Sequence, residues 1–331
     1  MRRILALSIF LLINILMRAQ VNNLNKIFTA DYSKENFKIE YQDLLYKTID
    51  TTDLKLDIYS KKGLDSSSPV VIFVHGGNWN RGNKSMILQN NLRFMLQAFI
   101  DMNYRVASID YRLASKRTPV NCAISDVKDA VRWIKCHGID YGIDTSNIVL
   151  CGSSAGAHIS MMAAYTSDEL KPLAEAERPG KDSVEAYNSE VDALINCYGP
   201  VNIRTTLRYK NDFLVKIVKV LSKKLYKLFT ELISDFSGLS YPEQVSEIKV
   251  FLDQYSVDKI KNIRKTPTLS LHGYSDKVVS YRQAVILDRY LKSNMVSHKL
   301  HLYLDVDHAF KNINNKQKGD IQKEIFRFLR N

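Results

Sequence analysis

The chain is poor in cysteine, proline and glycine: its 331 residues include four, seven and thirteen of them. It also lacks internal repeats and low-complexity tracts. This composition argues against repeat architectures and biased, non-globular chains, and it is ordinary for a globular protein. At this length the chain can bury a substantial core, as one large α/β domain or two small ones.

The few cysteines do not predict a disulfide framework. Cys122 and Cys136 fall in one expected helix, where fourteen residues at 1.5 Å each would separate them by about 21 Å, too far for a bond. Cys151 and Cys197 fall in expected buried strands, where a free thiol behaves as a small hydrophobic group. We therefore expect four unpaired thiols.

The first nineteen residues differ from the rest of the chain. Arg2 and Arg3 precede a mostly apolar, uncharged run over residues 4–17, and Ala19 offers a cleavage point. This is the pattern of a secretory signal peptide, and the run is short for a membrane span. We expect residues 1–19 to be removed and residues 20–331 to form a secreted or periplasmic domain. Because Met17 and Arg18 are unusual next to a cleavage site, an uncleaved anchor remains the alternative.

The positive charge is concentrated in one segment. The net charge of +12 falls to +9 without the three arginines of residues 1–19, and eight basic residues but only one acidic residue lie between positions 204 and 227. A surplus confined to one segment does not predict a nucleic-acid-binding face. We expect no nucleic-acid partner, and the sequence leaves the oligomeric state open.

Strands and helices alternate along the chain from residue 41 onward. This order predicts an α/β fold with a mostly parallel, doubly wound sheet, whose binding sites lie at the carboxyl ends of the strands. The expected strands cover residues 44–48, 54–59, 70–74, 104–110, 148–151, 193–198, 268–272 and 299–303. The expected helices cover residues 84–102, 119–137, 157–164 and 320–329.

A helical insertion of about residues 201–262 interrupts the alternation after the sixth strand. Apolar residues and lysines are interleaved there, as in an amphipathic helix or helix pair. The segment fits a surface helix packed on the domain or a cap over the strand ends. A contact with a membrane surface is the least favoured interpretation.

The pentapeptide at 152–156, Gly-Ser-Ser-Ala-Gly, indicates a nucleophile elbow. It follows the apolar run 148–151 and opens a helical stretch rich in small residues. In such a turn the central serine sits on a strained backbone, and glycines two residues before and after it avoid collisions with the neighbouring strand and helix. Ser154 is therefore the candidate nucleophile.

A His-Gly-Gly turn follows the expected strand 70–74 and indicates an oxyanion hole. Gly76 and Gly77 leave backbone N–H groups unobstructed, and with the N–H of Ala155 they would form three donors for a developing oxyanion. Asn78 and Trp79 follow in the chain, and we expect both of them on the substrate side of this loop.

The candidate base and acid lie after the last two expected strands. His308 lies on the loop before the C-terminal helix, whereas its rival His158 lies down the helix from Ser154 and is expected to serve in packing or support. Asp276 is the candidate acid. Asp305 and Asp307 are alternatives, but they are so close to His308 in sequence that reaching its far ring nitrogen would strain the loop.

These motifs resemble those of α/β-hydrolase serine esterases, in the carboxylesterase and hormone-sensitive-lipase-like branch with a His-Gly-Gly loop. The order Ser154, Asp276, His308 is also the order of that fold. The resemblance covers about residues 46–329 and implies an α/β-hydrolase fold with a cap-like insertion. It assigns residues 110–113 a structural role in the loop beneath the active site.

The resemblance implies hydrolysis of short-chain carboxylic esters through an acyl-enzyme, without a metal or cofactor. In exported relatives such esters are often acetyl or feruloyl groups on plant polysaccharides, so a small-molecule or polysaccharide-linked ester is the expected substrate. Two positions depart from the family pattern: Asn78 replaces a common third glycine, and Asp307 replaces a frequent glycine, where it could raise the histidine pKa or face solvent.

Two alternative functions stay open at this point. The run from Ala155 to His158 also resembles arylformamidases and prenylcysteine methylesterases, so the leaving group is not determined. A non-catalytic binding member of the fold would usually have lost a triad or oxyanion residue, and none is missing here.

Overall fold

The computed structural model describes residues 35–89, 91–168, 184–207 and 223–330. In this part of the chain eight strands form one sheet, in the order β1-β2-β4-β3-β5-β6-β7-β8. β1–β2 and β2–β4 are antiparallel and the other neighbouring pairs are parallel, which confirms the mostly parallel sheet expected from the sequence. The strands are β1 (Phe37–Ile49), β2 (Thr52–Lys61), β3 (Ser68–Val74), β4 (Arg105–Ile109), β5 (Ile143–Ser153), β6 (Ala193–Cys197), β7 (Thr268–Gly273) and β8 (His298–Tyr303).

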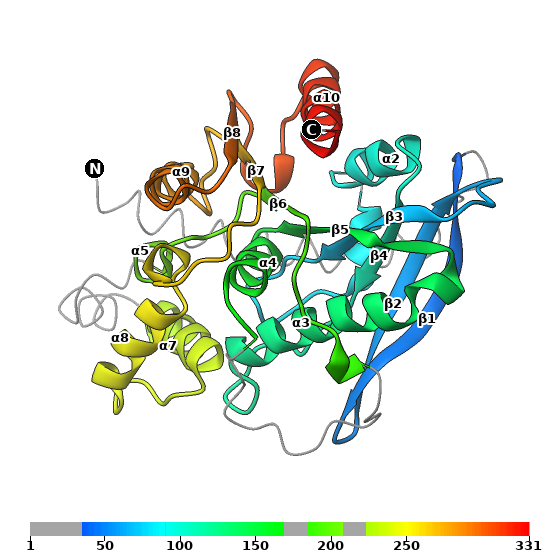
Figure 1. Ribbon diagram of the computed structural model, residues 1–331. Coiled ribbons are helices and arrows are strands. Elements are labelled where there is room, and N and C mark those ends of the chain that lie inside the picture. The colour runs from blue at the N-terminus through cyan, green and yellow to red at the C-terminus, as the bar shows by residue number, and fades with distance from the viewer. Residues whose placement is uncertain (1–34, 90, 169–183, 208–222, 331) are drawn as a thin grey trace.

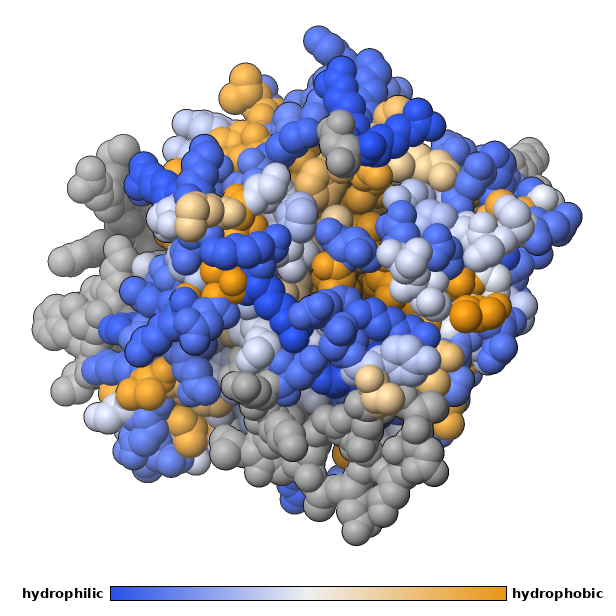
Figure 2. All heavy atoms as spheres, viewed as in Figure 1, coloured by the Kyte–Doolittle hydropathy of each residue, from blue (hydrophilic) through white to orange (hydrophobic). Residues whose placement is uncertain are grey.

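Helices cover both faces of the sheet (Figure 1). α2 (Arg93–Asp101) and α10 (Asn315–Leu329) pack on one face, and α3 (Val120–His137), α4 (Ala155–Tyr165) and α9 (Arg282–Ser293) pack on the other. In Figure 2 hydrophilic residues cover much of the visible surface, and hydrophobic residues come to the surface between the layers of α10 and α3. The core therefore consists of two apolar layers separated by the sheet.

The central strand β3 shows why these residues form a buried strand. Val71 and Phe73 pack toward α2 and α10, whereas Val70, Ile72 and Val74 pack toward the opposite helices. All five side chains are fully buried. A strand covered on both faces needs an unbroken apolar run rather than alternation, and this is the run that the sequence contains.

The expected helix over residues 84–102 is divided in the structure. A short 3-10 helix, η1 (Lys84–Leu88), comes first, and α2 follows it. The Asn83 side chain accepts a hydrogen bond from the Ser85 N–H, and Gln89 is extended with ψ 143°. The chain therefore turns between the two helices, and the prediction of one continuous helix was wrong.

Two element boundaries also differ from the sequence-based expectation. α10 begins five residues before the expected position 320 because Asn314 and Gln317 form a capping box that starts the helix earlier. β1 extends well beyond residues 44–48, since its pairing with β2 continues through several register shifts as far as Phe37.

The segment expected as a helical insertion contains three described α-helices. They are α5 (Ile203–Thr206), α7 (Lys223–Ser237) and α8 (Val245–Gln254). Ile233 and Phe236 of α7 and Ile248 of α8 are fully buried against the apolar layer of α3 and α4. Lys227 has a side chain 77% exposed. Residues 208–222, which include four of the eight basic residues between positions 204 and 227, lie outside the described residues.

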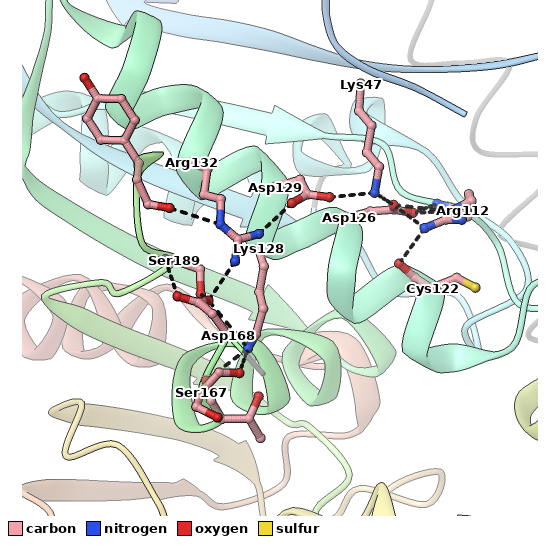
Figure 3. A network of polar contacts seen from close by, with 12 residues as sticks. Lys47, Arg112, Cys122, Asp126, Lys128, Asp129, Arg132, Ser167, Asp168 and Ser189 are labelled. Atoms are coloured by element: carbon pink, nitrogen blue, oxygen red, sulfur yellow. Dashed lines mark hydrogen bonds and ion pairs between the residues drawn. The ribbon is translucent and has the colours of Figure 1, made fainter. Parts of the chain in front are cut away.

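A network of buried ion pairs holds α3 in place (Figure 3). Asp126 accepts from Arg112 and from Lys47 of β1, each at 2.7 Å, and its side chain is fully buried. Asp129, one turn further along α3, accepts from the same lysine and from Arg132, each at 2.6 Å. The network therefore joins the N-terminal hairpin, α3 and the loop of residues 110–113, consistent with the structural role that the resemblance implies for that loop.

All four cysteines lie in the described part of the chain, and none of them forms a disulfide. Cys122 and Cys136 are both on α3, while Cys151 and Cys197 are on β5 and β6.

No helix within the described residues is long and apolar enough to cross a membrane. The expected signal peptide over residues 1–19 lies outside the described residues.

Candidate active site

Ser154 forms the sharp turn between β5 and α4. Its backbone has φ 53° and ψ −119°, a conformation that costs a non-glycine residue about 1–3 kcal/mol. A Cβ on Gly152 would lie 2.5 Å from the Gly156 carbonyl oxygen, and one on Gly156 would lie 2.2 Å from that of Val74. The turn therefore requires glycine at both positions, as the elbow motif predicts.

The structure brings Ser154, His308 and Asp276 together in one chain of hydrogen bonds. His308 Nδ1 lies 2.8 Å from Asp276 Oδ2, and its Nε2 lies 2.9 Å from Ser154 Oγ. Because an ionised carboxylate only accepts, Nδ1 carries the ring proton and donates it to Asp276. Nε2 then accepts from the serine hydroxyl, which is the geometry of a general base on a nucleophile.

Asp276 is held in its ionised form by its surroundings. Its Oδ1 accepts from the backbone N–H groups of Val278 and Val279 at 2.9 and 2.8 Å. Burial acts to raise the pKa of Asp276, but the charge of His308 and hydrogen bonds from His272 and His308 hold it below the ordinary value. Asp276 is therefore a charged acceptor throughout the neutral pH range.

The two alternative acids are not bonded to the His308 ring. Asp307 instead accepts from the backbone N–H groups of His308 and Lys277 at 2.7 and 2.9 Å. Its side chain is 15% exposed, so the carboxylate neither points freely into solvent nor contacts the imidazole. Asp307 therefore links the loop that carries Asp276 to the loop that carries His308, at a position where related sequences frequently have glycine.

The exchange of Asp276 for asparagine is expected to lower kcat by about 10³–10⁴ because an amide no longer selects the imidazole tautomer with its proton on Nδ1. The matched control is Asp305→Asn, a change at the exposed alternative acid. It is expected to keep activity within about twofold, because surface substitutions away from special features have small effects. Steady-state kinetics of both variants on p-nitrophenyl acetate would distinguish them. If both variants lost kcat equally, Asp276 would not be the residue that orients His308.

The candidate oxyanion loop lies directly against the elbow. A Cβ on Gly76 would lie 3.2 Å from Ser154 Cβ, so the loop backbone approaches the nucleophile closely. Among the described residues, no acceptor takes the N–H of Gly76 or Gly77. Ala155 is the first residue of α4, where the N–H groups have no intrahelical acceptor. Gly76 and Ala155 thus lie next to the nucleophile, and the N–H groups of all three expected donors have no acceptor among the described residues.

Trp79 does not have the position that the sequence predicts. Trp79 is only 3% exposed, and its indole N–H donates to His158 Nδ1 at 3.2 Å. The expectation that this side chain lies open to substrate was therefore wrong, because it is turned inward and packed. Asn78, with φ 54°, is half-buried at the neighbouring position.

Two residues near the triad were missed by the sequence analysis. Tyr198, at the end of β6 with φ 46°, places its ring 5.0 Å from that of His308 in a T-shaped contact. His272 Nε2 donates to the Val279 carbonyl at 2.8 Å and lies 3.4 Å from Asp276 Oδ2. The signal for both was their position at the carboxyl end of a strand.

A second set of Ser, His and Asp side chains, with its serine and histidine side chains buried, lies on β7, β8 and α9. His298 Nε2 is 2.9 Å from Ser270 Oγ, and its Nδ1 is 3.0 Å from Asp288 Oδ1. Ser270, however, is fully buried within β7 and accepts a hydrogen bond from the Asn196 amide. A substrate cannot reach it, so this set serves packing, and the distances alone do not define a nucleophile.

The set of Ser154, His308 and Asp276 can perform nucleophilic chemistry on an acyl group. It combines a hydroxyl on a strained turn, a base, an ionised acid and unused backbone donors. In the described part of the chain, no cluster of three or more histidine, cysteine or acidic side chains could hold a metal ion.

The chain is similar to known esterases over most of its length. The chain is 28% identical over 283 residues to esterase LipC of Mycobacterium tuberculosis, covering 83% of this chain and 61% of that protein. It is 26% identical over 231 residues to the probable carboxylic ester hydrolase LipM of the same organism, covering 69% of this chain and 46% of LipM. The chain thus spans about half to three fifths of the length of these relatives.

A solved structure, a truncated carbohydrate esterase from gut microbiota, matches with a TM-score of 0.68 at 19% identity, covering 90% of this chain and 99% of that one. Together with the strand order, this likeness shows the α/β-hydrolase fold. The family model BD-FAE matches residues 56–291, more than half of the chain. The chain therefore belongs to the BD-FAE family.

Proposed function

We propose that the protein is a serine esterase that hydrolyses short-chain carboxylic esters through an acyl-enzyme. The observation that carries the proposal is the hydrogen-bonded chain from Asp276 through His308 to Ser154, which ends on a strained elbow. Membership in the BD-FAE family and the similarity to esterase LipC support the same reaction class.

In the proposed mechanism His308 takes the proton of Ser154 as the serine oxygen attacks the ester carbonyl. The N–H groups of Gly76, Gly77 and Ala155 would stabilise the resulting oxyanion, where one donor typically contributes about 10²–10³ in rate. The imidazolium, held by Asp276, then protonates the departing alcohol. Water activated by the same histidine then hydrolyses the acyl-enzyme, which releases the carboxylic acid product and restores Ser154.

For the substrate we propose an acetyl or feruloyl-type ester on a small molecule or a polysaccharide. One solved structure with this fold is that of a carbohydrate esterase, which makes an ester of a sugar chain the first class to test. Arylformamides and prenylcysteine methyl esters are the alternatives, since the run from Ala155 to His158 fits those hydrolases too. A non-catalytic binding role is disfavoured by the complete triad.

The experiment is a panel of acetyl, butyryl, octanoyl, feruloyl and formamide substrates offered to the purified chain. We expect kcat/KM to be highest for the acetyl, butyryl or feruloyl esters and at least about tenfold lower for octanoyl, because each misplaced methylene changes transition-state binding by about 1–3 kcal/mol. Preference for the formamide would favour the alternative. No turnover of any substrate and no labelling by a fluorophosphonate would reject the hydrolase assignment.

We further propose that the protein is exported by its N-terminal segment. The arginine pair before an apolar run and the small residue at Ala19 support cleavage there. N-terminal sequencing of the secreted or periplasmic protein would identify the mature end, and an intact Met1 in the membrane fraction would favour an uncleaved anchor.

A further inference from the structure

The candidate oxyanion loop has positive φ angles at three successive residues. Gly77, Asn78 and Trp79 have φ angles of 123°, 54° and 66°. Glycine and asparagine adopt positive φ readily, but a bulky aromatic residue there is a genuine outlier. A conformation of this kind persists only where the surrounding structure holds it. The contacts of Trp79 must therefore hold it in this conformation.

Three separate contacts fix Trp79. Its indole N–H donates to His158 Nδ1 at 3.2 Å, and its ring lies 4.9 Å from that of Phe236 in a T-shaped contact. Its carbonyl accepts from the Ala114 N–H at 2.8 Å. The Trp79 side chain therefore packs between α4 and α7. Its backbone is hydrogen-bonded to Ala114, next to the loop of residues 110–113.

His158 is itself held in one tautomer. Its Nε2–H donates to the Tyr255 carbonyl at 2.7 Å, so Nδ1 presents a lone pair to the indole N–H. Burial lowers the pKa of His158 to about 4, which keeps the ring neutral and Nδ1 an acceptor at neutral pH. His158 also lies one turn after Ser154 on the same helix.

We propose that Trp79 and His158 are positioning residues that align the oxyanion donors with the nucleophile. Helix α4 carries Ser154 at its start and His158 one turn later, so a single rigid element sets both the serine and, through Trp79, the loop of Gly76 and Gly77. This inference rests on the proposed esterase function. Errors of about 1 Å in such alignment reduce rates by about 100-fold.

The test separates the two hydrogen bonds of His158 by matched variants. His158→Asn retains an acceptor near the Nδ1 position, whereas His158→Gln retains a donor near the Nε2 position and removes the acceptor. Trp79→Phe removes the indole N–H but keeps an aromatic ring. We expect Trp79→Phe and His158→Gln each to lower kcat by about 10- to 100-fold with KM changed less than threefold, and His158→Asn to lose less.

A double-mutant cycle and an inhibitor give two measurements that would not change if Trp79 and His158 had a purely structural role. The double variant Trp79→Phe/His158→Gln is expected to be no slower than the worse single variant, because both remove one interaction. Affinity for a short-chain trifluoromethyl ketone, whose adduct places an oxyanion in the hole, should fall in parallel with kcat/KM. The control Trp133→Phe alters the second tryptophan, buried on α3 against Tyr141, and should leave kcat within twofold.

The outcomes distinguish this inference from the proposed function. An active wild type whose Trp79→Phe and His158→Gln variants keep normal kcat, or whose effects simply multiply in the double variant, would overturn the positioning role alone. Variants that only lower the melting temperature would do the same. A wild type that hydrolyses no ester and takes up no fluorophosphonate would instead overturn the esterase assignment.

Discussion

Replacement of Ser154 by alanine is expected to lower kcat by about 10⁴–10⁶, because the attacking oxygen is removed while the fold is left intact. The serine is the terminal member of the hydrogen-bonded chain from Asp276 and His308. The substitution removes one partly buried hydrogen bond, to His308, and no carbon atom, so the melting temperature should stay close to that of the wild type. The measurements are steady-state hydrolysis of p-nitrophenyl acetate and labelling by a fluorophosphonate.

The matched control is Ser270→Ala, in the second Ser-His-Asp set. The distances from serine to histidine are the same in the two sets, 2.9 Å, but Ser270 is fully buried in β7. We expect this variant to keep wild-type labelling and near-normal kcat, with a stability loss of about 1–3 kcal/mol from unsatisfied partners. If Ser154→Ala retained more than a tenth of the activity, the assignment of the nucleophile would be wrong.

The exchange of Gly156 for alanine is expected to disrupt the elbow, with a loss of more than about 3 kcal/mol in the free energy of unfolding. A Cβ there would lie 2.2 Å from the carbonyl oxygen of Val74 and 2.3 Å from that of His75. Both atoms are backbone at the end of the central strand β3, so relief requires α4 to move away from the sheet. The same movement would separate Ser154 from the oxyanion loop and lower kcat by about 100-fold or more.

Gly319→Ala is the matched control for this substitution. Gly319 lies inside α10, and an added Cβ would meet nothing within 4 Å. Alanine there should stabilise the protein by about 0.5–1 kcal/mol because it restricts the unfolded chain and favours the helix. Urea denaturation followed by circular dichroism would measure both changes. A Gly156→Ala variant as stable as the wild type would contradict the close approach of α4 to β3.

The sheet and the candidate triad could be predicted because their signals are local. Residues 70–74 form an unbroken apolar run, since β3 is buried on both faces, and the elbow glycines lie within five residues of sequence. Asp276 and His308 lie on the loops that follow β7 and β8, and parallel strands bring their carboxyl ends together. Strand order and short motifs were therefore sufficient to find side chains 154 positions apart that lie 2.9 Å from each other.

The remaining features depend on contacts between distant segments. Nothing near Trp79 in the sequence indicates that its ring will be turned inward, because the partners that hold it lie on α4 and α7. The start of η1 likewise depends on a distant residue, because the Asp110 carboxylate accepts from the Lys84 N–H at 2.8 Å. Ser270 and His298 form a second set of the same geometry, and only burial shows that it is inaccessible.

The position of β8 at the edge of the sheet has a consequence for inactivation. Within the described residues β8 pairs with β7 alone, several of its side chains are partly exposed, and His308 lies on the loop that follows it. Proteins open locally with free energies below that of global unfolding, and edges open before cores. Fraying of β8 would displace the base while β3, β5 and β6 kept the elbow intact. In mild denaturant, hydrolytic activity would therefore decline before the spectroscopic signal of the folded core.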